Sequence, residues 1–177
     1  MKPEQLRYDI YISLMASLAI VIHAMEAAIP SPLPWVKFGL ANTITLATIV
    51  MFGLKAGMTV TLTRVFIGTL LTGIFMTPAF FLALSGGVAS TFVLAFAYKR
   101  FSNNFSIIGI SILGAFTHTL VQIIVAYLIL IRHFQIFLAM PLFLTFSLVA
   151  GLVSGLAADY IVRHLKEVEG IRRITEF

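Results

Sequence analysis

Residues 23–42 read His-Ala-Met-Glu-Ala-Ala-Ile-Pro-Ser-Pro-Leu-Pro-Trp-Val-Lys-Phe-Gly-Leu-Ala-Asn, and this stretch separates two long apolar runs. The first run enters it carrying His23 and Glu26, which lie three residues apart and therefore on one face of a helix. The helical pattern is broken by three prolines at alternate positions, Pro30, Pro32 and Pro34. Because a carboxylate at membrane depth is energetically costly, Glu26 is a candidate functional residue.

The composition on either side of this stretch indicates an integral membrane protein. Of 177 residues, 60% are apolar and 11% are charged, and the mean hydropathy is +1.04, whereas about a quarter of a soluble domain is charged. We expect a single domain over residues 1–177, embedded in the lipid bilayer of the cell membrane. The net charge of +5 is explained by cytoplasmic loops, so nucleic acid is not an expected partner. The absence of cysteine excludes disulfides and thiol chemistry.

The apolar runs predict an all-α bundle of six transmembrane helices, at residues 10–29, 38–52, 58–76, 79–98, 105–131 and 134–164. Short polar or glycine-containing segments separate them, including a turn at residues 53–57 and a stop at Thr77-Pro78. A cleaved signal peptide is the alternative for the first run. We favour a retained helix, because this run exceeds the usual apolar core of a signal peptide and equally apolar runs follow it.

The distribution of basic residues predicts that both termini are cytoplasmic. With this orientation, nine basic residues lie inside: Lys2, Arg7, Lys55, Lys99, Arg100, Arg163, Lys166, Arg172 and Arg173. Only Lys37 and Arg132 lie outside, and Arg64 lies within a helix. This asymmetry follows the positive-inside rule, and it places the proline-rich connection outside.

Polar residues inside the predicted helices are candidates for a binding site. Arg64 lies in the third helix, while His118 and Gln122 lie near the middle of the fifth. A lipid-facing guanidinium would cost at least about 2.5 kcal/mol, so Arg64 should face the protein interior or a wet cavity. Two interpretations stay open: Arg64 forms a structural ion pair with Glu26, or it contacts a ligand. For His118, an interhelical hydrogen bond is the alternative to ligand contact.

Weaker candidates add uncharged groups to the same predicted site. Asn42, Ser85 and Gly86 would contribute hydrogen-bonding groups or close backbone approach in a cavity open to the outside. Trp35 is either an anchor at the membrane interface or a stacking surface for a ligand. His23 either joins the site or lies at the periphery of the protein.

Small residues on the first helix form a second pattern, made of Ser13, Ala16 and Ser17. On the sixth helix, Gly151 and Gly155 form a comparable stripe. Such stripes allow close helix packing, either with a partner protein or within this chain.

Motifs for catalysis and cofactor binding are absent from the sequence. It contains no phosphate-binding loop for ATP, no cluster of metal ligands, and no aspartate-rich pair for Mg²⁺ and diphosphate. We therefore expect neither an enzyme nor a bound metal or cofactor.

Three segments resemble the bacterial Gx transporter family, also described as heptaprenyl diphosphate synthase component I. They are residues 26–42, 63–73 and 84–87, and the resemblance extends over nearly the whole chain. That family is similar to the substrate-binding S components of energy-coupling factor (ECF) transporters, which are six-helix proteins of this size.

The resemblance implies binding and uptake of a small molecule such as a vitamin or an isoprenoid or quinone-related precursor. S components dock through small residues of their first helix to a coupling module, which consists of a transmembrane subunit and two ATPases. Their Ala-x-x-x-Ala docking motif is represented here by Ser13-x-x-x-Ser17. The family's other name implies an alternative role as a non-catalytic membrane subunit in prenyl diphosphate synthesis, and relatives also imply a flavin-linked membrane redox assembly.

Overall fold

The computed structural model describes residues 3–28 and 39–167 and contains only helices and connections in these ranges. The five α-helices are α1 (Pro3–Ala28), α2 (Leu40–Leu71), α3 (Pro78–Phe101), α4 (Ile107–Ala126) and α5 (Met140–Lys166). Two short segments connect α4 to α5: the π-helical Tyr127–Ile131 and the 3-10 helix Phe134–Leu138. Five helical segments are long and apolar enough to cross a membrane, which supports a multi-pass membrane protein.

Helix α2 is folded back on itself at Gly53. This residue has φ 82° and ψ −174°, a conformation that is essentially restricted to glycine. On either side of it the two arms of α2, residues 40–52 and 54–71, run antiparallel. Thr45 and Thr61, each eight residues from Gly53, are joined by a 3.3 Å hydroxyl hydrogen bond, and the Thr61 hydroxyl lies 2.8 Å from that of Thr91 on α3. The predicted break between the second and third helices is therefore present, but as one residue and not as a five-residue turn.

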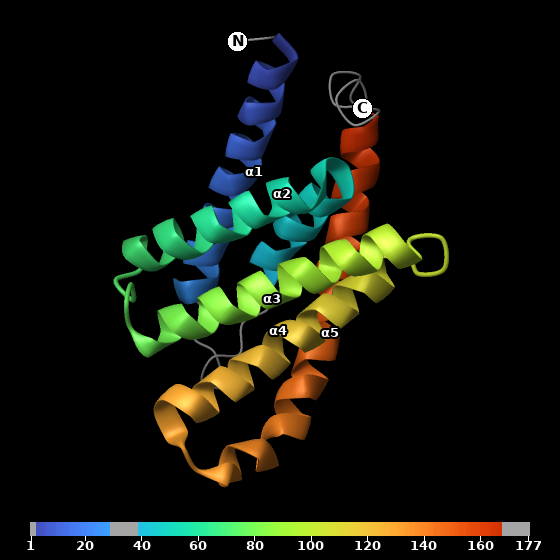
Figure 1. Cartoon of the computed structure of the whole chain (residues 1–177). Helices are drawn as coiled ribbons and strands as arrows, with labels where there is room; N and C mark the ends of the chain where they lie inside the picture. The colour runs from blue at the N-terminus through green and yellow to red at the C-terminus, as the bar shows by residue number, and fades with distance from the viewer. Residues whose placement is uncertain (1–2, 29–38, 168–177) are drawn as a thin grey trace.

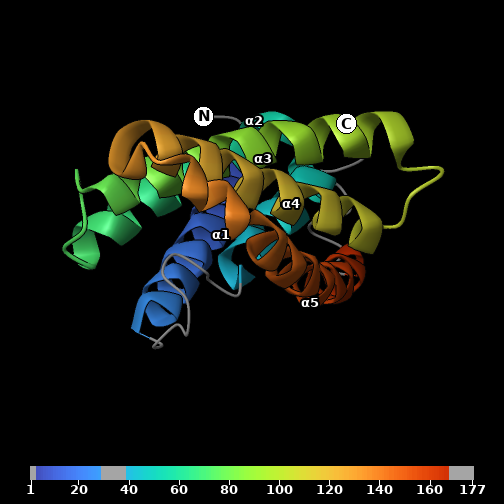
Figure 2. The ribbon, with the colours of Figure 1, turned by 90° about the horizontal axis from the view of Figure 1, so that it is seen from below.

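The helices form two layers that cross each other. The second arm of α2 lies beside α3 and α4 in one layer, while α1, the first arm of α2 and α5 lie in the other (Figures 1 and 2). Ile44 in the first arm packs in a core cluster with Ile12 of α1, whereas Leu46 packs in a cluster with Ala158 of α5. The first arm is thus buried between α1 and α5.

Small residues permit close approach between α5 and α4. A Cβ added to Gly151 would lie 2.8 Å from the Cα of Ile112, and one added to Gly155 would lie 2.8 Å from the Cα of Ile108. The small-residue stripe of α5 is therefore used for packing against α4 within this chain.

Several predicted helix boundaries differ from the structure. Helix α1 begins at Pro3, seven residues before the predicted start, because residues 4–7, Glu-Gln-Leu-Arg, are good helix formers. The predicted third helix ends early, at Leu71, since Gly73 and Met76 both have positive φ. The last helix begins at Met140 and not at Phe134; it has a proline in its first turn, where no backbone donor is needed. The predicted boundaries at Ile29 and Phe38 lie outside the described residues.

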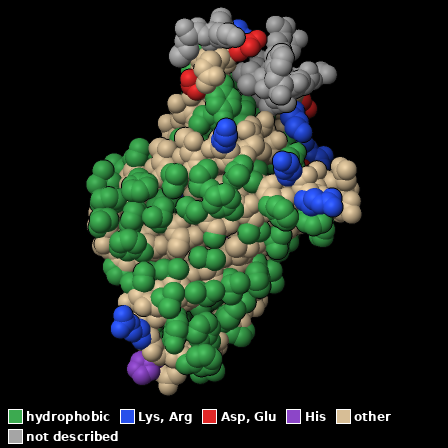
Figure 3. Space-filling model, viewed as in Figure 1, with side chains coloured by type: hydrophobic (Ala, Val, Ile, Leu, Met, Phe, Trp, Pro, Cys, Tyr) green, Lys and Arg blue, Asp and Glu red, His purple; other side chains and the backbone are tan. Residues whose placement is uncertain are grey.

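The molecular surface is consistent with insertion in a bilayer. Hydrophobic side chains cover the flank of the molecule, while most of the visible Lys and Arg side chains lie toward the end where α1 begins and α5 ends, and basic side chains are fewer at the opposite end (Figure 3). This arrangement separates an apolar belt from a basic end.

Candidate functional site

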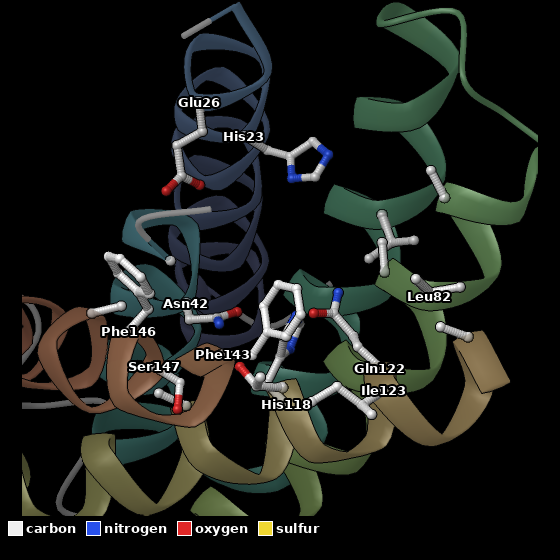
Figure 4. A pocket seen from close by; sticks show the side chains of 18 of the residues that line it. His23, Glu26, Asn42, Leu82, His118, Gln122, Ile123, Phe143, Phe146 and Ser147 are labelled. Carbon is white, nitrogen blue, oxygen red and sulfur yellow. The ribbon is translucent and has the colours of Figure 1, made fainter. Parts of the chain in front are cut away.

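A cavity of about 160 Å³ lies at the end of the bundle opposite the beginning of α1 and the end of α5. It is bordered by the end of α1, the start of α2, the start of α3, the end of α4 and the start of α5 (Figure 4). Six of the predicted site residues line it: His23, Glu26, Asn42, Arg64, His118 and Gln122. The fold thus brings together polar residues that are up to 99 positions apart in the sequence, from His23 to Gln122.

Glu26 is bound to the first turn of α2. Its carboxylate oxygens accept hydrogen bonds from the backbone N–H groups of Leu40, at 2.8 Å, and Ala41, at 3.4 Å. Helix α2 begins after Gly39, which has φ 72° and provides no side-chain cap. Glu26 therefore satisfies amides that lack partners within their own helix, and its negative charge faces the positive end of the helix dipole.

The start of α2 is also held from the opposite side. The Ser154 hydroxyl of α5 donates a 3.0 Å hydrogen bond to the carbonyl oxygen of Gly39. Contacts from α1 and α5 consequently fix the position of Asn42, which lies one turn farther along α2.

Arg64 is buried beside Asn42, with 4% of its surface exposed. One terminal nitrogen of its guanidinium, Nη1, donates a 2.9 Å hydrogen bond to Oδ1 of Asn42. The two residues lie 11 positions on either side of Gly53, so the fold-back of α2 creates this contact. Within the described ranges, Nε of Arg64 is buried and has no hydrogen-bond partner.

The structure does not form the direct ion pair between Arg64 and Glu26 that the sequence left open. Both side chains line the cavity. The ion pair found among residues 3–28 and 39–167 joins Arg163 to Asp159, and no carboxylate there lies within 4.0 Å of an Arg64 nitrogen. Glu26 instead contacts the first backbone amides of α2, whereas Arg64 contacts the side-chain amide of Asn42.

On the other side of the cavity, His118 and Gln122 are positioned by close packing against α3. Nδ1 of His118 lies 3.5 Å from the Ser90 hydroxyl. A Cβ added to Gly86 would lie 2.9 Å from Cγ of Gln122 and 3.2 Å from Cε1 of His118. Gly86 does not line the cavity; it allows α4 to present these two side chains to it.

Metal binding is not supported by the described part of the chain, which contains no group of three His, Cys, Asp or Glu side chains suited to hold a metal ion. The cavity offers a guanidinium, a carboxylate, amides and imidazoles, which together suit hydrogen bonding to an organic molecule.

Comparison with known proteins identifies the family. A family model described as heptaprenyl diphosphate synthase component I matches residues 15–161. The chain belongs to this family. Neither the curated proteins nor the solved structures searched contain a match. The family description names a component of a synthase and does not assign catalysis to that component.

The remaining predicted residues of this family member lie away from the cavity or outside the described ranges. Ser85 does not line the cavity, and its hydroxyl bonds to the carbonyl oxygen of Phe81 at 2.8 Å. Trp35 lies outside the described residues. On α1, Ser13 and Ser17 are on the surface, but Ala16 is buried in a core cluster with Val60 of α2. The predicted docking stripe is therefore divided between the surface and the core.

Apolar lining residues were not predicted from the sequence. Phe143 and Phe146, three residues apart at the start of α5, border the cavity together with Leu82 of α3. Their helical spacing puts both rings on one side of α5. Apolar residues within an apolar helix do not stand out, so only this spacing could have indicated them.

Proposed function

We propose that this protein is a membrane-embedded binding protein that captures a small molecule in this cavity for uptake, as S components do. One observation carries the proposal: polar side chains from α1, α2 and α4 converge on one apolar-walled cavity and include a buried guanidinium that makes one hydrogen bond to the described residues. Concave, largely apolar sites with a few convergent polar groups are typical of small-molecule sites. The bound molecule is a vitamin-like or isoprenoid or quinone-related precursor.

In the proposed topology, the protein is one domain that crosses the bacterial cell membrane six times, with both termini in the cytoplasm. The antiparallel arms of α2 on either side of Gly53 supply two of the six passes. The basic end visible in Figure 3 then faces the cytoplasm, and the cavity faces outward. An ATP-driven coupling module on the cytoplasmic side would release the captured molecule. The module would dock on the surface of α1 that contains Ser13 and Ser17.

The experiment that tests this function begins with native mass spectrometry of the protein purified from its own host in a mild detergent. We expect the spectrum to contain an additional small mass. After identification, uptake of that compound should be lost when the gene is deleted and restored by the wild-type gene. Purification without any additional mass, together with unchanged uptake, would contradict the proposal.

The family description favours a second candidate function, as a non-catalytic membrane subunit for prenyl diphosphate synthesis. In that case a soluble prenyl synthase should copurify with the protein, and deletion of the gene should alter the yield or chain length of its product. Uptake would be unchanged. The same purification therefore distinguishes the two functions.

A further inference from the structure

We propose that the bound molecule carries an anionic oxygen-bearing group, a carboxylate or a phosphate, which Arg64 holds in the cavity. This assignment rests on the function proposed above. It adds the charge of the bound molecule, the residue that binds the charged group, and the apolar character of the rest of the molecule.

Arg64 has unused hydrogen-bonding capacity and, among the described residues, no carboxylate in direct contact. A guanidinium offers five N–H donors, and the described contacts engage one of its nitrogens, with Asn42. The side chain is more than nine-tenths buried and lines the cavity. Within residues 3–28 and 39–167 no carboxylate lies within 4.0 Å of it. Burying a cation in this way is unfavourable unless an anion with matching acceptors joins it.

Glu26 does not provide an equivalent site for a cation. Both oxygens of its carboxylate accept hydrogen bonds from the α2 amides, at 2.8 and 3.4 Å. The helix dipole already places partial positive charge there. A cationic molecule would therefore compete with a helix terminus for Glu26 while sharing the cavity with the Arg64 guanidinium.

The apolar part of the lining indicates what the rest of the molecule is like. Phe143, Phe146 and Leu82 border the cavity (Figure 4). Apolar and aromatic walls favour an apolar or ring-containing body. Two sources supply this chemistry: a small water-soluble organic acid captured from outside, or an anionic phospholipid from the bilayer.

Three probes of nearly equal size and different charge test the assignment: benzoate, benzamide and benzamidinium. The full chain is purified in an uncharged detergent, freed of retained molecules, and its thermal unfolding is followed with each probe. We expect benzoate to raise the Tm of the wild type by about 2–4 °C at concentrations several-fold above its Kd. Neither benzamide nor benzamidinium should produce this shift.

Substitutions identify the residue responsible. Arg64→Gln should abolish the benzoate shift, and Arg64→Lys should reduce it, because a point charge replaces a planar fork. The control Arg100→Gln makes the same exchange at an exposed position on α3 and should leave the shift unchanged. If Arg64→Gln fails to fold, the response of the wild-type protein to the three probes still shows which ligand charge the cavity prefers.

The outcomes separate this inference from the proposed function. A shift from benzamide or benzamidinium in place of benzoate would leave small-molecule binding standing and overturn the anionic assignment. No shift from any probe would count against the binding function and this inference together. Native mass spectrometry distinguishes the sources by the retained mass, that of a phospholipid or of a smaller acid; a retained neutral or cationic molecule would overturn the proposal.

Discussion

Arg64 is held by Asn42 and not by the carboxylate of Glu26, although all three side chains line one cavity. The proposed ligand-binding role of Arg64 and a structural ion pair predict different effects on stability. Removing one member of a buried ion pair typically costs about 3–5 kcal/mol. Removing a buried charge that, like Arg64 among the described residues, has no carboxylate within 4.0 Å eliminates a desolvation penalty and loses one described hydrogen bond, that to Asn42.

For the protein freed of bound molecules, we therefore expect Arg64→Met to change the free energy of unfolding by less than about 1 kcal/mol, or to raise it. Thermal or denaturant unfolding in detergent measures this directly. A loss of several kcal/mol that is recovered in the double variant with Glu26→Gln would instead identify a structural ion pair.

Glu26 should behave differently from Arg64, because its carboxylate completes the start of α2. We expect Glu26→Gln to lower the free energy of unfolding by about 0.5–2 kcal/mol, through loss of charge at a helix N-terminus. The exposed Glu167 provides the matched control: Glu167→Gln should have little effect. Equal stability of the two variants would show that Glu26 does not anchor α2.

At the scale of elements, the fold-back of α2 at Gly53 aligns the residues of the site. Asn42 and Arg64 are the same number of positions from Gly53 in the two arms, as are Ile49 and Gly57, and a Cβ added to Gly57 would overlap Cγ1 of Ile49. Any change in the geometry of the bend moves Arg64 relative to Asn42.

We predict that Gly53→Ala destabilises the protein by about 1–3 kcal/mol, because its backbone conformation is strained for any residue with a Cβ. Nothing lies within 4 Å of an added Cβ, so strain and not a clash is responsible. The control is Gly109→Ala in α4, where the added Cβ makes an ordinary 3.4 Å contact with Phe105 and a helical alanine is favoured. Melting temperatures of the two variants provide the comparison, and a Gly53→Ala protein as stable as Gly109→Ala would refute the role of the bend.

The elements were more predictable from the sequence than their contacts. Apolar runs separated by Gly53, by Thr77-Pro78 and by residues 102–104 indicated where helices end, because the bilayer requires long apolar segments with satisfied backbones. The contact of Glu26 with the start of α2 was not predicted, since a sequence separation of 14 positions between Glu26 and Leu40 does not fix where the chain returns. One signal could have indicated this contact. Gly39 precedes α2 and has no side chain to cap the helix, so the first backbone N–H groups of α2 need a hydrogen-bond acceptor from elsewhere in the chain.

The residues of the candidate site were likewise only partly predictable from the sequence. Charged and amide side chains such as Arg64 and Gln122 were predictable because polar groups are expensive in apolar helices and tend to face the protein interior. Phe143 and Phe146 could not be predicted as site residues, because the side of α5 that faces the cavity depends on how α5 packs on α4. Ser85 was predicted and is not in the cavity, since its hydroxyl bonds within its own helix.

At the scale of the whole molecule, the proposed topology places opposite ends of the bundle on opposite sides of the membrane. The chain contains no cysteine, so single cysteines report their location without background. Ser102 and Gln135 are both exposed and lie in the connections after α3 and after α4. We expect a membrane-impermeant thiol reagent to label Gln135→Cys but not Ser102→Cys in intact cells, and both after permeabilisation. Labelling of Ser102→Cys in intact cells would contradict the topology.

A structure of the protein purified with its retained molecule is the most direct test of the proposed anion site at Arg64. Cryo-electron microscopy of the chain bound to a rigid antibody fragment would resolve the cavity. We predict non-protein density against the Arg64 guanidinium, with Glu26 still bound to the N–H groups of Leu40 and Ala41. A cavity without such density, in which the Glu26 carboxylate has moved to within 4.0 Å of Arg64, would contradict the account.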